Sequence, residues 1–172
     1  MKWMSEQQIY WVDPPLGGRL AVVTRPRSQK HLAALKAAGI DMLISMLEPE
    51  EAVDVGLADE AAWCAQAGLE FLNVPISDHG VPSSFDVIES VMPELAERLR
   101  DGRGIAAHCY AGLGRSPLLI ASVLIHHGLT DGKAIKAVSL ARETWVPEMD
   151  SQHRWLLEFA LRCREREAGP AQ

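Results

Sequence analysis

The chain has 172 residues, 48% of them hydrophobic, and a formal net charge of −6 at pH 7. That length supplies one hydrophobic core and is too short for two ordinary domains, so we expect a single domain over residues 1–172 with its core at about 9–166. The negative charge argues against nucleic acid or an anionic membrane surface as a partner.

Cysteine content and hydropathy indicate the compartment. Three cysteines are too few for a disulfide framework of the usual kind and suit a reducing cytoplasm. The first eight residues lack the apolar core of a signal peptide, and no apolar run is long enough to span a bilayer. We therefore expect a cytoplasmic protein that works as a monomer.

In the first half of the chain, short apolar runs alternate with helical patterns. The apolar runs predict strands at residues 9–12, 20–23, 42–47 and 70–76. The first of these strands ends at a turn that contains Pro14 and Pro15. Caps and spacing predict helices over 28–39, from 49 to an interruption near 56, and over 58–67.

The second half repeats the alternation. A helix is expected over about 85–99, with a kink at Pro93, followed by a central strand that leads to His108. Further helices are expected over about 116–127, 131–142 and 150–166, with Trp145 and Trp155 in the core. This order predicts an α/β fold with a central, mostly parallel sheet of about five strands flanked by helices. Ligands of such sheets bind beyond the carboxyl ends of the strands, where Asp78 and Cys109 fall.

The stretch from Gly104 to Pro117 carries the strongest chemical signal. It predicts a buried strand, a tight loop and a helix that begins near Ser116. Gly112 and Gly114 permit positive φ, so that successive backbone N–H groups of the loop can turn inward around an anion. The helix N-terminus adds its dipole, and Arg115 supplies a planar fork for two oxygens of one phosphate. The expected phosphate-binding residues are Tyr110, Ala111, Gly112, Leu113, Gly114 and Arg115.

Cys109 would lie beneath such an anion. Backbone N–H groups, a helix N-terminus and Arg115 all favour its thiolate, and a thiolate under a bound phosphate is a nucleophile directed at phosphorus. The alternative is a buried structural cysteine beside an ordinary strand-to-helix turn. The joint occurrence of strand, His108, loop glycines, Arg115 and helix favours the nucleophile.

The run from His108 to Ser116 resembles the signature of the cysteine-dependent protein tyrosine phosphatases, namely His-Cys, five residues, Arg, then Ser or Thr. Within that family, the residues from Ala111 to Ser116 are most similar to those of the dual-specificity branch, near the kinase-associated phosphatase. The resemblance implies a cysteinyl-phosphate mechanism without metal or other cofactor. It also implies a phosphorylated protein or another phosphate monoester as substrate, and a general-acid aspartate on a separate loop.

Asp78 is the predicted general acid. It follows a predicted strand upstream of Cys109, and the stretch from Val74 to Asp78 is similar to the acid loop of that family. The alternative is an aspartate in an ordinary Asx-turn. Asp86 is a second candidate, but it fits better in the first turn of the next helix, and His79 is interpreted as a loop residue.

Four other residues have roles implied by the resemblance. The ring of His108 would bond the loop and hold the cysteine, unless it is an ordinary core histidine. Ser116 would donate to the departing thiolate, although any helix start favours a hydroxyl there. Gln152 lies where the family often has a glutamine near the site, and a solvated helix residue is the alternative. Glu148 stands where some relatives have a water-orienting glutamine, which leaves that role in doubt.

Two other functional classes stay open. One is a catalytically silent phosphate-binding module, and the other is a sulfurtransferase of the rhodanese kind, which also holds a cysteine in an anion-binding loop. Positions 110, 111 and 113 of the loop carry no added cations, which disfavours highly phosphorylated inositides. The pattern indicates no metal site, since His126 and His127 fall at a helix C-terminus.

Overall fold

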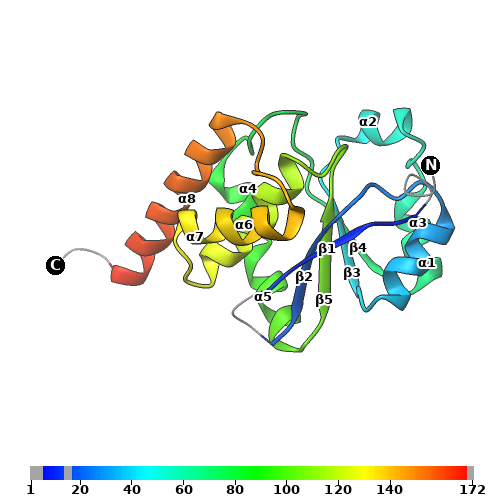
Figure 1. Ribbon diagram of the computed structural model, residues 1–172, viewed down its shortest axis with the longest axis horizontal. Helices are drawn as coiled ribbons and strands as arrows, with labels where there is room; N and C mark the ends of the chain where they lie inside the picture. The colour runs from blue at the N-terminus through cyan, green and yellow to red at the C-terminus, as the bar shows by residue number, and fades with distance from the viewer. Residues whose placement is uncertain (1–5, 14–16, 170–172) are drawn as a thin grey trace.

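A five-stranded sheet forms the centre of the computed structural model, which describes residues 6–13 and 17–169 (Figure 1). The spatial order is β1-β2-β5-β3-β4. Only the β1–β2 pair is antiparallel, and the pairs β2–β5, β5–β3 and β3–β4 are parallel. The strands are β1 (Ile9–Val12), β2 (Arg19–Val23), β3 (Met42–Ser45), β4 (Glu70–Asn73) and β5 (Gly104–His108). The predicted α/β fold with a mostly parallel sheet is therefore confirmed.

Helices cover both faces of the sheet (Figure 1). On one face lie α1 (Gln29–Ala37) and α3 (Glu60–Ala67). The other face carries α4 (Phe85–Glu89), α5 (Met92–Arg100), α6 (Arg115–His126), α7 (Asp131–Arg142) and α8 (Asp150–Ala168). The short α2 (Pro49–Asp54) lies beyond one end of the sheet rather than on a face. Within the described residues, no helix combines the length and apolar character needed to cross a membrane.

β5 and α6 form the most buried part of the fold. Ile105 and Ala107 of β5 face the larger core, whereas Ala106 faces the smaller core beneath α1 and α3. α6 packs between the sheet, α7 and α8, so it is buried along nearly its whole length. This explains why the run from Leu118 to Ile125 is hydrophobic on every side, as is typical of a central helix. The loop between β5 and α6 is thereby held by two rigid elements.

Backbone pairing continues past the carboxyl ends of the parallel strands. Met46 N donates to His108 O at 3.0 Å, and Ile76 N donates to Met46 O at 3.1 Å. The connections that leave β5, β3 and β4 therefore lie side by side in that order. The predicted strands 42–47 and 70–76 are shorter in the structure, but this pairing accounts for their additional apolar residues.

Four expectations about elements and core need comment. Pro93 does not kink one helix but separates two, because α4 ends at Glu89 and Pro93 occupies the first turn of α5, where its missing N–H is tolerated. Trp145 is not in the core: it is 67% exposed and stacks on His153, since it lies in the loop after α7. Trp155 is buried as expected. The predicted turn at 14–15 and the first five residues lie outside the described residues.

Candidate active site

Cys109 lies at the junction of β5 and the loop to α6. Its buried Sγ is 3.2 Å from Ser116 Oγ and accepts a hydrogen bond from Gly112 N at 3.3 Å. A cavity of about 230 Å³ opens above it, here called the nucleophile cavity. The cavity is lined by Asp78, His79, Cys109, Tyr110, Ala111, Leu113, Gly114, Arg115 and Glu148. Of the six residues predicted for anion binding, five line this space, namely Tyr110, Ala111, Leu113, Gly114 and Arg115, and the N–H of Gly112 bonds the sulfur of Cys109.

The carbonyl groups of this loop are held away from the cavity. Arg142 of α7 donates from Nε to Gly112 O at 3.0 Å and from Nη2 to Ala111 O at 3.3 Å. Glu148 N donates to Leu113 O at 2.9 Å. Because three successive carbonyls bond outward, the loop can present its N–H groups inward, as a nest for an oxyanion requires.

The two loop glycines serve different purposes. Gly112 has φ +71°, as predicted for a left-handed turn. Gly114 does not, because its φ is −124°. A Cβ at Gly114 would instead lie 2.9 Å from Gln152 Nε2 and 3.3 Å from Glu148 Oε1. Close approach of these two side chains, rather than positive φ, explains the second glycine.

Arg115 is only 2% exposed, and its terminal nitrogens are fully engaged. Nη1 donates to Glu51 Oε2 at 2.7 Å and to Ile76 O at 2.9 Å. Nη2 donates to Glu51 Oε1 at 2.7 Å and to Asp78 Oδ1 at 3.2 Å. Glu51 thus grips one edge of the guanidinium. An oxyanion would bind the adjacent edge, where Nε–H and one Nη2–H can both donate. That Nη2–H donates to Asp78 Oδ1 in this structure.

Glu51 is a site residue that the sequence analysis missed. Its hydrogen bonds from Arg115 keep the pKa of its carboxyl below the ordinary value, so it remains a carboxylate. It comes from α2, which follows β3, the strand between β5 and β4. The same rule that paired Asp78 with Cys109 could have found it, because acids that follow an apolar strand gather at the carboxyl edge of the sheet.

Asp78 lines the nucleophile cavity with a side chain that is 56% exposed. Its Oδ1 accepts from His79 N at 3.0 Å as well as from Arg115. His79 has φ +58° and also lines the cavity, so it is a loop residue close to the site. Asp86 lies in the first turn of α4 and is not among the residues that line this cavity. The structure therefore brings Asp78, and not Asp86, to Cys109.

Gln152 is not a solvated helix residue, since it is 0% exposed. Its Nε2 donates to Gly80 O at 3.0 Å, and its Oε1 accepts from Met149 N at 3.2 Å. It therefore ties the loop that carries Asp78 to the start of α8. Glu148, by contrast, lines the nucleophile cavity, with Oε1 3.7 Å from His79 Nε2.

His108 is fully buried and joined to a second acid that the sequence analysis missed. Its Nδ1 lies 3.2 Å from Cys109 O, and its Nε2 lies 2.6 Å from Oε1 of buried Glu60. A carbonyl oxygen only accepts hydrogen bonds, so Nδ1 donates to Cys109 O, while Nε2 is bonded to the carboxyl group of Glu60. Glu60 therefore fixes the orientation of the ring that bonds the backbone of Cys109. Glu60 is the first residue of α3, and its sequence position alone indicates nothing beyond a favourable helix start.

Glu60→Gln should weaken the support that His108 gives to the loop at Cys109. The amide keeps the shape of the side chain but replaces the carboxyl group that bonds His108 Nε2, so the ring is held less firmly. We expect alkylation of Cys109 by iodoacetate near neutral pH to slow by roughly tenfold, the order of one lost hydrogen bond. A lower melting temperature with an unchanged alkylation rate would show that Glu60 is only structural. Labelling of the Cys109→Ser variant provides the background.

The other cysteines are poor nucleophiles. Burial, together with the nearby Glu60 carboxylate, raises the pKa of the Cys64 thiol to about 12. Burial also raises the pKa of Cys163. Both are therefore thiols near neutral pH, and alkylation in that range reports on Cys109.

No group of three or more His, Cys, Asp or Glu side chains in the described residues is arranged to hold a metal ion. The described residues therefore contain no candidate metal centre. The expected independence from metal remains a prediction for assay.

Comparison with known proteins agrees with this geometry. A family model described as "Polymorphic toxin system, DSP-PTPase phosphatase" matches residues 20–129. Cyclin-dependent kinase inhibitor 3 of Rattus norvegicus is 29% identical over 137 residues, which cover 78% of this chain and 64% of the relative. Protein tyrosine phosphatase type IVA 2 of Mus musculus is 32% identical over 121 residues, which cover 69% of this chain and 67% of the relative.

The fold has a close structural counterpart as well. A crystal structure of kinase associated phosphatase, with its catalytic-site cysteine substituted by serine, superimposes with a TM-score of 0.84. The match covers 96% of this chain and 98% of that chain at 23% sequence identity, so it concerns the fold. The family model spans more than half of the chain, and the relative that is 32% identical is by name a protein tyrosine phosphatase. The chain therefore belongs to the DSP-PTPase family of cysteine-dependent dual-specificity phosphatases.

Proposed function

We propose that this protein hydrolyses phosphate monoesters through a cysteinyl-phosphate intermediate and acts on phosphorylated proteins. The observation that carries the proposal is the arrangement at Cys109 Sγ. The sulfur lies below a cavity whose loop carbonyls bond outward, with Gly112 N–H and Ser116 Oγ within 3.3 Å of it and Arg115 in the cavity wall. This arrangement suits a tetrahedral oxyanion held above a thiolate.

In the first step, the Cys109 thiolate attacks phosphorus and the bond from phosphorus to the leaving oxygen breaks. Loop N–H groups and Arg115 stabilise the equatorial oxygens. The phosphate takes the Nη2–H that Asp78 accepts in the free protein, which releases the carboxyl group toward the leaving oxygen. Asp78 enters this step protonated and gives its proton to that oxygen.

In the second step, Asp78 is a carboxylate and accepts a proton from water as the water oxygen attacks phosphorus. The phosphorus–sulfur bond breaks, inorganic phosphate forms, and Ser116 Oγ donates to the departing thiolate. Glu148 lines the same cavity and can accept from the attacking water, but unlike a glutamine it cannot donate. Nothing in these steps calls for a metal ion.

The substrate class rests on the relatives. The matched relatives include a protein tyrosine phosphatase, and this chain spans 64% of the length of the cyclin-dependent kinase inhibitor 3 of Rattus norvegicus. A phosphorylated protein is therefore proposed as the substrate. A reducing cytoplasm suits the cysteines, which are free in the described part of the chain, and a monomer suffices because this part supplies every group used above.

Turnover of para-nitrophenyl phosphate tests the function and separates the alternatives. We expect hydrolysis that is unchanged in excess chelator and blocked by vanadate. Binding of vanadate without turnover would instead identify a silent phosphate-binding module. Transfer of sulfur from thiosulfate to cyanide would identify a sulfurtransferase, and loss of activity on chelation would contradict the metal-free mechanism.

Asp78→Asn tests the general acid. A proton donor matters most when the leaving group is a poor one, so the variant should slow phenyl phosphate by roughly 10²- to 10⁴-fold and activated aryl phosphates much less. The basic limb of the pH profile should flatten, while the acidic limb, which follows ionisation of Cys109 and substrate, should survive. Equal slowing of all leaving groups with both limbs kept would make Asp78 structural and turn attention to Asp86.

A further inference from the structure

Tyr110 stands where three hollows of the surface meet. Its side chain is 53% exposed, and it lines the nucleophile cavity together with two neighbouring hollows. A substrate whose phosphate reaches Cys109 must therefore place its flanking parts on either side of Tyr110. The charges of the two neighbouring hollows then decide which flanks are favoured.

The first neighbour, here called the basic hollow, has a volume of about 210 Å³ and is lined in part by Arg25, Arg27 and Tyr110. The guanidinium of Arg25 lies over the Tyr110 ring, 4.3 Å from its centroid. Its Nε and Nη1 atoms are buried without a hydrogen-bond partner. A desolvated cation without a bonded counter-ion is costly, and an anion entering this hollow would lower that cost. Glu6 also borders the hollow.

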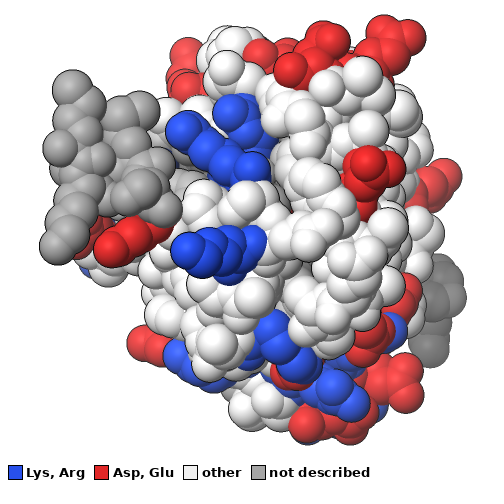
Figure 2. All heavy atoms as spheres, turned by 90° about the vertical axis from the view of Figure 1, so that its right-hand side faces the viewer, with Lys and Arg blue, Asp and Glu red and all other residues white. Residues whose placement is uncertain are grey.

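The second neighbour, here called the acidic hollow, has a volume of about 720 Å³ and carries the opposite charge. Its lining includes Glu48, Glu50, Glu51, Asp54 and Asp78, with Tyr110 at its border. Glu51 is committed to Arg115, whereas Glu50 and Asp54 are exposed on α2. Figure 2 shows acidic side chains along the upper edge of this side of the molecule, over α2, and a smaller basic group below them.

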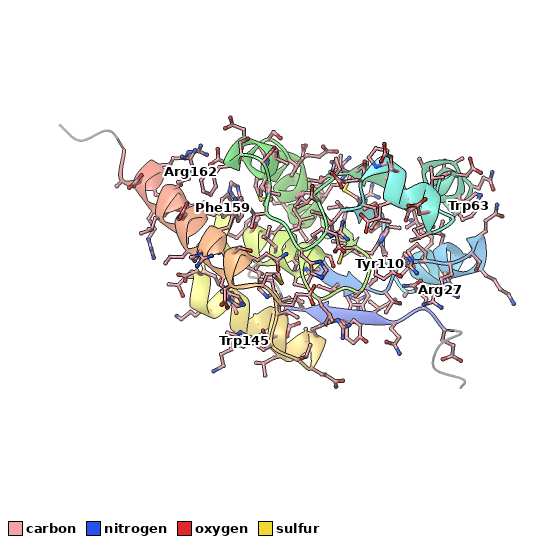
Figure 3. All side chains as sticks on the ribbon, turned by 90° about the horizontal axis from the view of Figure 1, so that it is seen from above. Arg27, Trp63, Tyr110, Trp145, Phe159 and Arg162 are labelled. Atoms are coloured by element: carbon pink, nitrogen blue, oxygen red, sulfur yellow. The ribbon has the colours of Figure 1, made fainter. Side chains whose placement is uncertain are left out.

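Strand order produces this separation of charge. Four neighbouring strands lie in the order β2-β5-β3-β4. The basic residues Arg25 and Arg27 follow β2, and Cys109 follows β5. The acidic residues Glu50 and Asp78 follow β3 and β4. Basic and acidic groups therefore lie on opposite sides of the nucleophile. Figure 3 shows Tyr110 and Arg27 near one another when the molecule is seen from above.

We propose that the basic hollow binds an acidic side chain next to the phosphorylated residue of a peptide substrate, while the acidic hollow favours a basic residue on the other side. This deepens, and rests on, the proposed phosphatase function. A polyanion such as an inositol polyphosphate fits less well, because some of its phosphates would face the carboxylates of α2. A peptide can carry opposite charges on its two flanks.

Four peptide designs around one phosphorylated residue test the proposal. In the order N-terminal flank, C-terminal flank, the designs are neutral–neutral, acidic–basic, basic–acidic and acidic–acidic. Each design is made once with phosphotyrosine and once with phosphothreonine. One of the two peptides with opposite charges on its flanks should have a kcat/KM roughly two- to five-fold above that of the neutral peptide, as expected of exposed charge pairs. The peptide with the reversed charges should have a kcat/KM below that of the neutral peptide. The preference should weaken as salt is raised.

Arg27→Glu supplies the matched change, because Arg27 is exposed and takes no part in the steps at Cys109. The variant should lose or invert the preference while turnover of para-nitrophenyl phosphate stays at the wild-type level. Arg100→Glu makes the same charge change at the exposed last residue of α5, near the end of β5 opposite Cys109, and should keep the preference.

The outcomes separate the two proposals. Normal para-nitrophenyl phosphate turnover with equal rates for both mixed peptides overturns the peptide-flank proposal alone, whereas no turnover of any substrate defeats the phosphatase function. A doubly acidic peptide that surpasses both mixed ones would contradict the role of the acidic hollow. An inositol polyphosphate that surpasses every peptide, and is slowed by Arg27→Glu, would replace the peptide with a polyanion.

Discussion

Cys109→Ser is expected to abolish turnover of phosphate monoesters, with a fall in kcat of roughly 10⁴-fold or more. The serine hydroxyl occupies the place of Sγ, between Ser116 Oγ and Gly112 N, but it does not ionise near neutral pH. The outward-bonded carbonyls and Arg115 are unchanged in the variant. Vanadate or phosphate binding, measured by calorimetry, should therefore persist although hydrolysis is lost.

Cys163→Ser is the matched control for that experiment. Cys163 is partly buried on α8, away from the nucleophile cavity, and its substitution should leave kcat close to the wild-type value. Turnover by Cys109→Ser at even a few per cent of the wild-type rate would exclude Cys109 as the nucleophile. Loss of both turnover and anion binding would show instead that the thiol is needed to shape the loop.

Arg115→Lys should be nearly as damaging, with a loss in kcat of at least roughly 10²- to 10³-fold. The guanidinium bonds Glu51 along one edge and offers another edge to the phosphate, and an ammonium group cannot serve both edges at once. The carboxylate of Glu51 would also lose a hydrogen bond, although the carboxylate itself stays partly buried. Steady-state kinetics with para-nitrophenyl phosphate, together with the inhibition constant for vanadate, measure the two effects.

Arg162→Lys provides the comparison for that change. Arg162 pairs with Glu89 on the far side of the fold, and lysine there should leave turnover unaffected. Near-normal rates for Arg115→Lys would make Arg115 peripheral to the reaction. In that case the loop N–H groups alone would stabilise the phosphate.

The sequence determined the local parts of this protein. Strand, loop and helix from Gly104 to Ile125 follow from apolar runs and glycine positions within a short stretch, and the structure reproduces them. The alternation of strands and helices likewise predicted the parallel sheet and the edge where Asp78 and Cys109 meet. These features depend on neighbouring residues and on general rules of sheet topology, which is why they could be inferred without coordinates.

Only the tertiary structure decided which distant charges meet. Glu51 lies 64 residues from Arg115 and Glu60 lies 48 residues from His108, and nothing near either acid in the sequence marks its partner. Packing, rather than composition, buried Gln152 against Gly114 and left Trp145 in solvent. The separation of basic and acidic hollows depends in the same way on the order of β2, β5 and β3 in the sheet. A buried charge needs a partner, and strand order and helix packing bring that partner from elsewhere in the chain.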